Sequence, residues 1–297
     1  MSGTSVRHEG APTWPALLAV LATISQEVGA AVAVGLFDAL GVAGTVCARF
    51  VVAALVLGVV VRPRVRGLDS REFRAVAALA VPLTVMNVCF YESLSRIPLG
   101  MAVTVEICGP LLLSIALNRR WSGCIWALVA FCGVALLGLG RGAVHGSYVV
   151  GLALAAGAAI SWVGYILATA HSGRVFPNLD ALALATVIGA VLTAPAAALS
   201  VDGGSVLHWE VLGVVVVVGL MCSVIPYSLE LISLRTLPAS TFAVLTSLSP
   251  AIATIAGLFI LHQRLGLTDY LAVALVVTAS AGAVRSGSNP DHGLGIE

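Results

Sequence analysis

Ten long apolar runs, separated by short polar breaks, constrain this chain more than any other feature of its sequence. A hydrocarbon core of about 30 Å needs roughly 20 apolar residues per helix, and each run approaches that length. The runs are continuous rather than alternating, so they predict helices and not the strands of a barrel. We expect ten transmembrane helices near residues 14–35, 40–61, 75–94, 100–117, 121–139, 148–169, 180–200, 211–231, 239–261 and 266–284.

The charge content agrees with lipid as the solvent. Of the 297 residues, 10% are charged and 59% are hydrophobic, whereas about a quarter of the residues of a soluble domain are charged. Fifteen basic and 14 acidic residues leave a net charge of +1, and no basic stretch is interleaved with aromatics, which excludes nucleic-acid binding. All the basic residues are arginines, so a lysine Schiff base and a P-loop lysine are also excluded.

The arginines predict the orientation of the chain. With an even number of spans both termini lie on one side, and if that side is cytoplasmic, the inner segments hold eleven arginines against three outside. This bias follows the positive-inside rule. We therefore expect cytoplasmic tails at 1–13 and 285–297 and a location in the bacterial inner membrane.

Cysteines and histidines give no sign of a metal or a cofactor. The six cysteines lie in or beside apolar runs without C-x-x-C spacing, and the six histidines lie in breaks or tails without ligand spacing. We expect the cysteines to act as small apolar packing residues.

The two halves share a spaced pattern. Four positions recur 140 residues later: Ser93, Leu94, Pro98 and Pro110 recur as Ser233, Leu234, Pro238 and Pro250. Ile24-Ser25 has a similar counterpart in Ile160-Ser161. Because five spans precede the boundary, the second half is expected to be inverted, as in many secondary transporters. The predicted fold is all-α, with two inverted five-helix repeats over 14–139 and 148–284; prolines that fall by chance at helix ends are the alternative explanation.

Residues 86–118 and 225–250 carry a resemblance to a known family. Their runs P-L-G-x-A-V-x-x-E-x-x-G-P and P-Y-S-L-E resemble the EamA-type threonine/homoserine exporters of the drug/metabolite transporter superfamily. The resemblance implies a ten-helix inner-membrane carrier built from two five-helix repeats. Two carboxylates that many relatives carry are replaced here by Ser249 and Gln263, and Glu27 is an acid where a small residue is usual.

Ionisable residues within spans are costly and normally face a cavity or a partner. They are Glu27, Arg49, Glu92, Glu106 and Glu230. Arg49 and Glu106 lie midway along their spans, so we expect them to form a pair or to line the pathway together; a purely structural ion pair is the alternative.

The other acids have two interpretations each. Glu27 is a candidate for a coupling proton or a group that reaches the outer headgroups. Glu230 belongs either to the pathway or to the interface near Arg235. Glu92 has a simpler explanation as an i,i+4 partner of Arg96.

Aromatic and amide groups are expected to form the pathway walls. Asn87 and Tyr91 share one helix face, as do Trp162 and Tyr165, and Tyr227 precedes Glu230. The alternative is an interfacial belt of aromatic residues.

The predicted function is export of small polar metabolites by alternating access, and the resemblance implies amino acids such as threonine or homoserine as the substrates. The chain has no ATP-binding motif, so proton antiport is the hypothesis and facilitated exchange stays open. Drug or secondary-metabolite efflux and nutrient uptake through the same fold are the rivals, while an enzyme would need convergent acids or histidines at one membrane face. The expected partners are a small-molecule substrate, the lipid bilayer and a coupling proton; the oligomeric state is not predicted.

Overall fold

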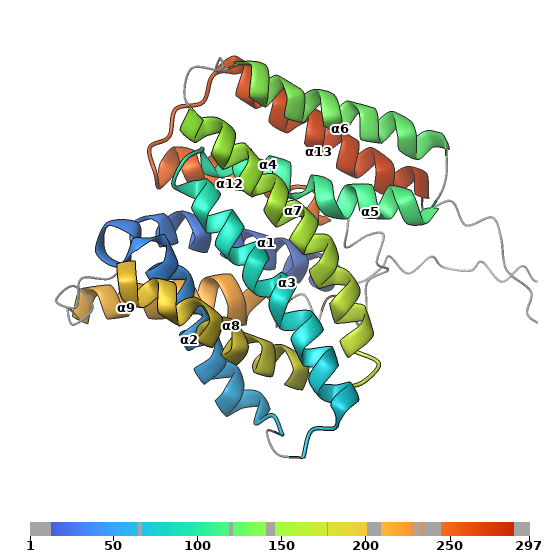
Figure 1. The fold of residues 1–297 in the computed structure, drawn as a ribbon. Helices are drawn as coiled ribbons and strands as arrows, with labels where there is room; N and C mark the ends of the chain where they lie inside the picture. Colours follow the sequence, from blue (N-terminus) through green and yellow to red (C-terminus); the bar gives the residue numbers. More distant parts are fainter. Residues whose placement is uncertain are drawn as a thin grey trace, which may run out of the picture.

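The structure, a computed structural model, describes residues 13–64, 67–118, 121–140, 146–176, 178–200, 209–226, 229, 233 and 245–287. Every regular element within these ranges is a helix (Figure 1). In chain order they are α1 (Thr13–Val34), α2 (Phe37–Val61), α3 (Ser70–Leu94), α4 (Leu99–Glu106), α5 (Cys108–Asn118), α6 (Trp121–Gly140), α7 (Gly146–Ser172), α8 (Asp180–Ser200), α9 (Trp209–Gly219), η2 (Leu220–Val224), α12 (Ser249–Phe259) and α13 (Leu267–Gly287). The predicted all-α class is confirmed.

Five of these helices are long and apolar enough to cross a membrane: α1, α2, α3, α7 and α8. Shorter apolar helical segments occupy the positions of the other five expected spans, at Leu99–Leu113, Cys124–Leu136, Trp209–Val224, Ser249–Phe259 and Leu267–Ala283. The chain is therefore a polytopic helical membrane protein, with a helix at each of the ten predicted positions.

The expected continuous helix at 100–117 is wrong in one respect. The structure divides it into α4 and α5, with a break at Ile107. Proline lacks a backbone N–H and its ring disturbs the carbonyl four residues earlier. Pro110 follows Glu106 by four residues, so the helix breaks directly beside that carboxylate.

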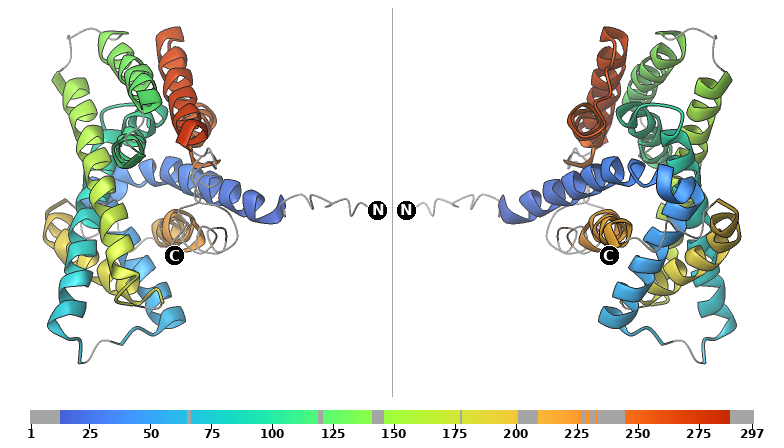
Figure 2. Two further views of the ribbon diagram at one scale, coloured as in Figure 1. Left: turned by 90° about the vertical axis from the view of Figure 1, so that its right-hand side faces the viewer. Right: turned by 90° about the vertical axis from the view of Figure 1, so that its left-hand side faces the viewer.

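Small residues bring pairs of distant helices together. Figures 1 and 2 show α6 beside α13, and α3 crossing α7; α2 packs along α8 and α4 against α12. At Gly100 an added Cβ would lie 2.9 Å from Thr254 Cα, and at Gly133 it would lie 3.0 Å from the Ala272 carbonyl. Glycine thus allows the backbones to approach closely, as is common between membrane helices.

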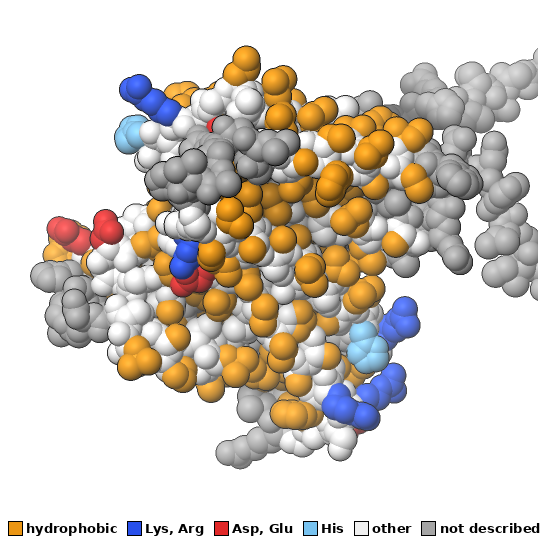
Figure 3. Space-filling view, turned by 45° about the horizontal axis from the view of Figure 1, so that its top comes forward, with side chains coloured by type: hydrophobic (Ala, Val, Ile, Leu, Met, Phe, Trp, Pro, Cys, Tyr) orange, Lys and Arg blue, Asp and Glu red, His pale blue; other side chains and the backbone are white. Residues whose placement is uncertain are grey.

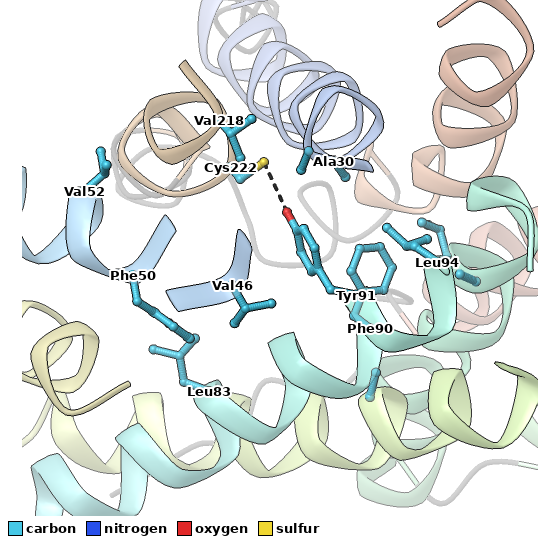
Figure 4. Close-up of a cluster of buried hydrophobic side chains, with 14 of the residues drawn as sticks. Ala30, Val46, Phe50, Val52, Leu83, Phe90, Tyr91, Leu94, Val218 and Cys222 are labelled. Atoms are coloured by element: carbon cyan, nitrogen blue, oxygen red, sulfur yellow. Dashed lines mark hydrogen bonds between the residues drawn. The ribbon is translucent and has the colours of Figure 1, made fainter. Parts of the chain in front are cut away.

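The main core extends across α1, α2, α3, α4, α7, α8 and α9. Tyr91 of α3 is fully buried and points toward Cys222, with Phe90 beside its ring, while Phe50 of α2 lies farther away next to Leu83 (Figure 4). The outer faces are also apolar: Figure 3 shows hydrophobic side chains spread across the surface, with charged groups near its edges. Val60 is 73% exposed and Leu199 92%. Such surfaces suit lipid rather than water.

A capping box sets the start of α3. The Asp69 carboxylate accepts from the Glu72 N–H at 2.6 Å, and the Glu72 carboxylate accepts from the Asp69 N–H at 2.9 Å. Glu72 also pairs with Arg64 at 2.8 Å. These contacts end the polar connection between α2 and α3 and fix where the next apolar helix begins.

Candidate functional site

Arg49, in the middle of α2, is the centre of a buried polar cluster. Its side chain is 8% exposed. Nε donates to Ser223 Oγ at 3.1 Å, Nη1 donates to the Tyr91 hydroxyl at 3.2 Å, and Nη2 donates to the Cys222 carbonyl at 3.0 Å. The guanidinium carbon also lies 5.4 Å from the Tyr91 ring centre. A buried guanidinium needs acceptors for its N–H groups, and here α3 supplies one of them and η2 supplies two.

The Cys222 carbonyl is available because the helix around it is irregular. Residues Leu220–Val224 form a π-helical turn, and Pro226 cannot donate a backbone hydrogen bond to the carbonyls that precede it. The Cys222 carbonyl accepts instead from Arg49, and the Met221 carbonyl accepts from the Ser25 hydroxyl of α1 at 2.9 Å. Single π-turns often occur at functional sites.

Close packing of α1 holds this turn against Arg49. An added Cβ at Gly29 would lie 2.6 Å from Cys222 Sγ and 2.8 Å from Met221 Cβ, so only glycine fits at this crossing. The Tyr91 hydroxyl in turn donates to Cys222 Sγ at 3.7 Å (Figure 4). From the sequence, Cys222 is expected to be a packing residue, and Ser223 is not among the candidate site residues. The signal that could have found them is the proline four residues after Cys222.

A cavity of about 40 Å³ opens beside Arg49. Five predicted residues line it: Glu27, Arg49, Asn87, Tyr91 and Glu106. The structure thus brings the two expected opposite charges to one cavity. Asn87 is oriented by its own helix, since Nδ2 donates to the Leu83 carbonyl at 2.8 Å.

A second cavity, of about 80 Å³, contains the remaining described candidates, Trp162 and Tyr165 of α7. Gln26, Met86 and Glu106 line both cavities, so the two adjoin and Glu106 faces both. Tyr227 and Glu230 lie outside the described residues. Gln26, Met86 and six further lining residues were not predicted; these six are Thr23, Ala30, Phe90, Cys222, Thr246 and Ser249.

Two buried carboxylates share this space. Glu27 is 4% exposed and Glu106 is 9% exposed, so Glu27 does not reach the protein surface. Glu106 interacts electrostatically with both Arg49 and Glu27. Within the part of the chain that the structure describes, neither carboxylate accepts a hydrogen bond.

Other polar residues of the sequence analysis have separate roles. Glu92 pairs with Arg96 at 2.6 Å as the expected i,i+4 bridge. Ser249, which stands at one of the two positions where the resemblance implies a carboxylate, lines the second cavity. Gln263, the other replacement, accepts from the Leu99 N–H at 3.1 Å and so caps α4. In the ranges that the structure describes, no group of three histidine, cysteine or acidic residues could hold a metal.

A bundle of apolar helices around buried ionisable groups is typical of membrane transport proteins. Residues 149–285 match the EamA-like transporter family. The threonine/homoserine exporters RhtA of Escherichia coli (strain K12) and Salmonella typhimurium (strain LT2) are each 32% identical to this chain, with 92% of both chains covered. The chain belongs to the EamA-like transporter family, within the drug/metabolite transporter superfamily.

A solved structure supports the fold independently. A chain described as "Crystal structure of protein" superposes with a TM-score of 0.59 at 19% identity, and the match covers 93% of this chain and 98% of that one. The family and the apolar helices together make this chain a multi-pass membrane transporter, and its named relatives are exporters rather than enzymes.

Proposed function

We propose that this protein is a secondary carrier that exports small zwitterionic amino acids of the threonine and homoserine type. The observation that carries the proposal is the shared cavity of Arg49 and Glu106. A guanidinium recognises a carboxylate with directional hydrogen bonds, and a buried carboxylate recognises an ammonium group. An α-amino acid presents both charges on adjacent atoms. The 32% identity to threonine/homoserine exporters points to the same substrates.

Transport proceeds by alternating access in this proposal. The ten helices form two inverted repeats, both termini are cytoplasmic, and the cavity lies between the repeats of an inner-membrane carrier. The repeat offsets support this arrangement. Glu106 and Thr246 are 140 residues apart, which is the offset of the repeated prolines. Gln26 and Trp162 are 136 residues apart, which is the offset between Ser25 and Ser161. Glu106, Thr246, Gln26 and Trp162 all line the second cavity.

An opposing proton gradient drives export. Glu27 and Glu106 are buried and face the cavity, so each is placed to carry a proton when the substrate has left. A zwitterion and a proton then occupy the cavity in alternate halves of the cycle. Glu27 lines the first cavity but not the second. In this proposal Glu27 therefore lies beside the bound substrate, and not between the carboxylate and the ammonium group of the substrate.

The test is counterflow of labelled threonine and homoserine in liposomes of purified protein, with and without a proton gradient. We expect saturable flux that an inward proton gradient accelerates. Glu106→Gln is expected to lower the flux at least about tenfold, because it removes the ammonium partner. Glu92→Gln, whose partner Arg96 lies on the same helix, is the control and should transport normally. A folded protein that moves no amino acid would overturn the proposal and direct the search to drugs or secondary metabolites.

A further inference from the structure

The second cavity is lined mainly by polar, uncharged side chains. Eight described residues line it, and five of them carry a hydroxyl group or an amide: Thr23, Gln26, Tyr165, Thr246 and Ser249. The first cavity differs, since Glu27, Arg49 and Glu106 all line it. Polar groups inside a membrane protein are costly unless they meet a polar partner. The second cavity is therefore suited to a neutral polar group rather than to a hydrocarbon.

Side chains of α1 and α12 meet at this cavity, because the two helices pack against each other. Thr23 and Gln26 are three residues apart and share one face of α1. The Thr23 hydroxyl donates to the Ala19 carbonyl at 3.1 Å, so its oxygen keeps the capacity to accept. Ser249 is the first residue of α12 and is 7% exposed. A serine hydroxyl both donates and accepts, so Ser249 can pair with another hydroxyl group in either direction.

Glu106 connects the two cavities, because it lines both of them. In the proposed function the α-ammonium group of the substrate binds at Glu106, and the α-carboxylate binds at Arg49, which lines the first cavity but not the second. The side chain of an amino acid leaves the same α-carbon as the ammonium group. It therefore extends past Glu106 into the second cavity, while the carboxylate stays in the first.

The size of the second cavity suits a short side chain. Its volume is about 80 Å³, whereas an apolar cavity of about 150 Å³ holds a benzene ring. A side chain of three or four non-hydrogen atoms fills the smaller volume. The side chains of threonine and homoserine each have three such atoms, and one of the three is a hydroxyl oxygen.

We propose that the second cavity is the subsite for the substrate side chain and that Ser249 hydrogen-bonds the side-chain hydroxyl group. The carrier then selects hydroxyl amino acids over hydrocarbon ones of the same shape. This inference rests on the proposed amino-acid export and specifies how its substrate class is recognised. Met86 and Trp162 contact the aliphatic part of the side chain. A site that hydrogen-bonds a hydroxyl group rejects the analogue without it far more strongly than a hydrocarbon wall discriminates by size.

Two pairs of amino acids with equal shape serve as probes. Threonine and valine differ by one hydroxyl group in place of a methyl group, and so do homoserine and norvaline. Initial counterflow rates within each pair, measured side by side in liposomes, give a ratio that does not depend on the amount of active protein. We expect the wild type to transport the hydroxyl member of each pair at least about tenfold faster.

Three variants assign this preference to one hydroxyl group. Ser249→Ala is expected to lower both ratios at least about threefold, because the substrate hydroxyl loses a hydrogen-bond partner. Ser249→Thr keeps a hydroxyl group and should keep the preference. Ser280→Ala is the matched control: Ser280 of α13 is a buried serine that is not among the described lining residues of either cavity, and its loss should leave both ratios unchanged.

Competition in the wild type serves as a second measurement if Ser249→Ala does not fold. Unlabelled valine should then need an at least about tenfold higher concentration than unlabelled threonine to halve the flux of labelled threonine. Equal concentrations would overturn the inference.

The outcomes distinguish this inference from the proposed function. Equal rates within both pairs would overturn the hydroxyl subsite and leave amino-acid export intact. Ratios that are unchanged in Ser249→Ala, or that fall as far in Ser280→Ala, would also overturn the subsite. A preference that falls in Ser249→Ala and is kept in Ser249→Thr would support it. No flux of any amino acid from a folded protein would overturn both proposals.

Discussion

Single residues determine what the cavity can bind. Among them, the side chain of Arg49 is held in position by three hydrogen bonds. Its guanidinium contacts α3 through Tyr91 and the π-turn through Cys222 and Ser223. The residues that supply these acceptors are themselves buried. Water therefore cannot take the place of Arg49 as their hydrogen-bond donor unless the structure rearranges. We interpret this network as the support that holds one positive charge at a fixed place beside two carboxylates.

Tyr91→Phe tests that support. The change keeps the ring, which packs against Phe90 at a centroid distance of 5.6 Å, but removes the hydroxyl that accepts from Arg49. A buried donor left without its partner costs about 1–3 kcal/mol. We expect the free energy of unfolding in detergent to fall by that amount. Tyr270→Phe is the control, since Tyr270 is 41% exposed, and equal stability of the two variants would contradict the network.

Helices contribute to the site through their irregular segments. The α4–α5 break lies directly beside Glu106, and the π-turn of η2 offers the Cys222 carbonyl to Arg49. In both places a proline follows by four residues and leaves a carbonyl without its helical donor. Broken helices are common at the binding sites of transporters, because irregular backbone is tolerated where it lines a cavity.

The position of α4, which carries Glu106, depends on its contact with α12. In Gly100→Ala the new methyl group would lie 2.9 Å from Thr254 Cα, so the two helices must separate. Overpacking of this kind costs about 1–3 kcal/mol, and we expect a lower unfolding midpoint together with slower transport. Gly58→Ala on α2 is the matched control, because its Cβ meets nothing within 4 Å and alanine favours a helix by about 0.5–1 kcal/mol. A Gly100→Ala protein as stable as this control would contradict the close packing.

At the scale of the whole molecule, the apolar outer surface and the charged interior reverse the usual pattern of a soluble protein. Hydrophobic side chains cover the visible face in Figure 3, while Glu27, Arg49 and Glu106 are buried. Lipid favours this arrangement, since it solvates apolar side chains and not charges. The proposed topology also follows from the environment, because the eleven-to-three arginine bias orients the chain.

Reporter fusions test the proposed topology. A fluorescent protein that folds only in the cytoplasm, fused after residue 297, is expected to fluoresce, because the proposed topology places both termini inside. Alkaline phosphatase fused at that place should be inactive. The same two reporters are also fused after Arg264, between α12 and α13. If that connection lies outside, the fluorescent protein should be dark there and alkaline phosphatase should be active. A phosphatase active at the C-terminus would show an odd number of spans or the opposite orientation.

The sequence by itself determined the all-α class, the helix positions and seven of the fifteen residues that line the two described cavities. Long apolar runs have few alternatives in lipid, where each backbone N–H and C=O must be paired within its own helix. Charges such as Arg49 and Glu106 are also visible in a sequence because their cost in lipid is large.

Only the tertiary structure decided which of these residues meet. Arg49 and Ser223 are 174 residues apart, and no local periodicity relates them. The part played by Gln26, Cys222 and Ser249 depends on how α1, η2 and α12 pack around α3 and α4. Such residues are ordinary within their own helices, and they become a site because close glycine crossings bring those helices around a shared cavity.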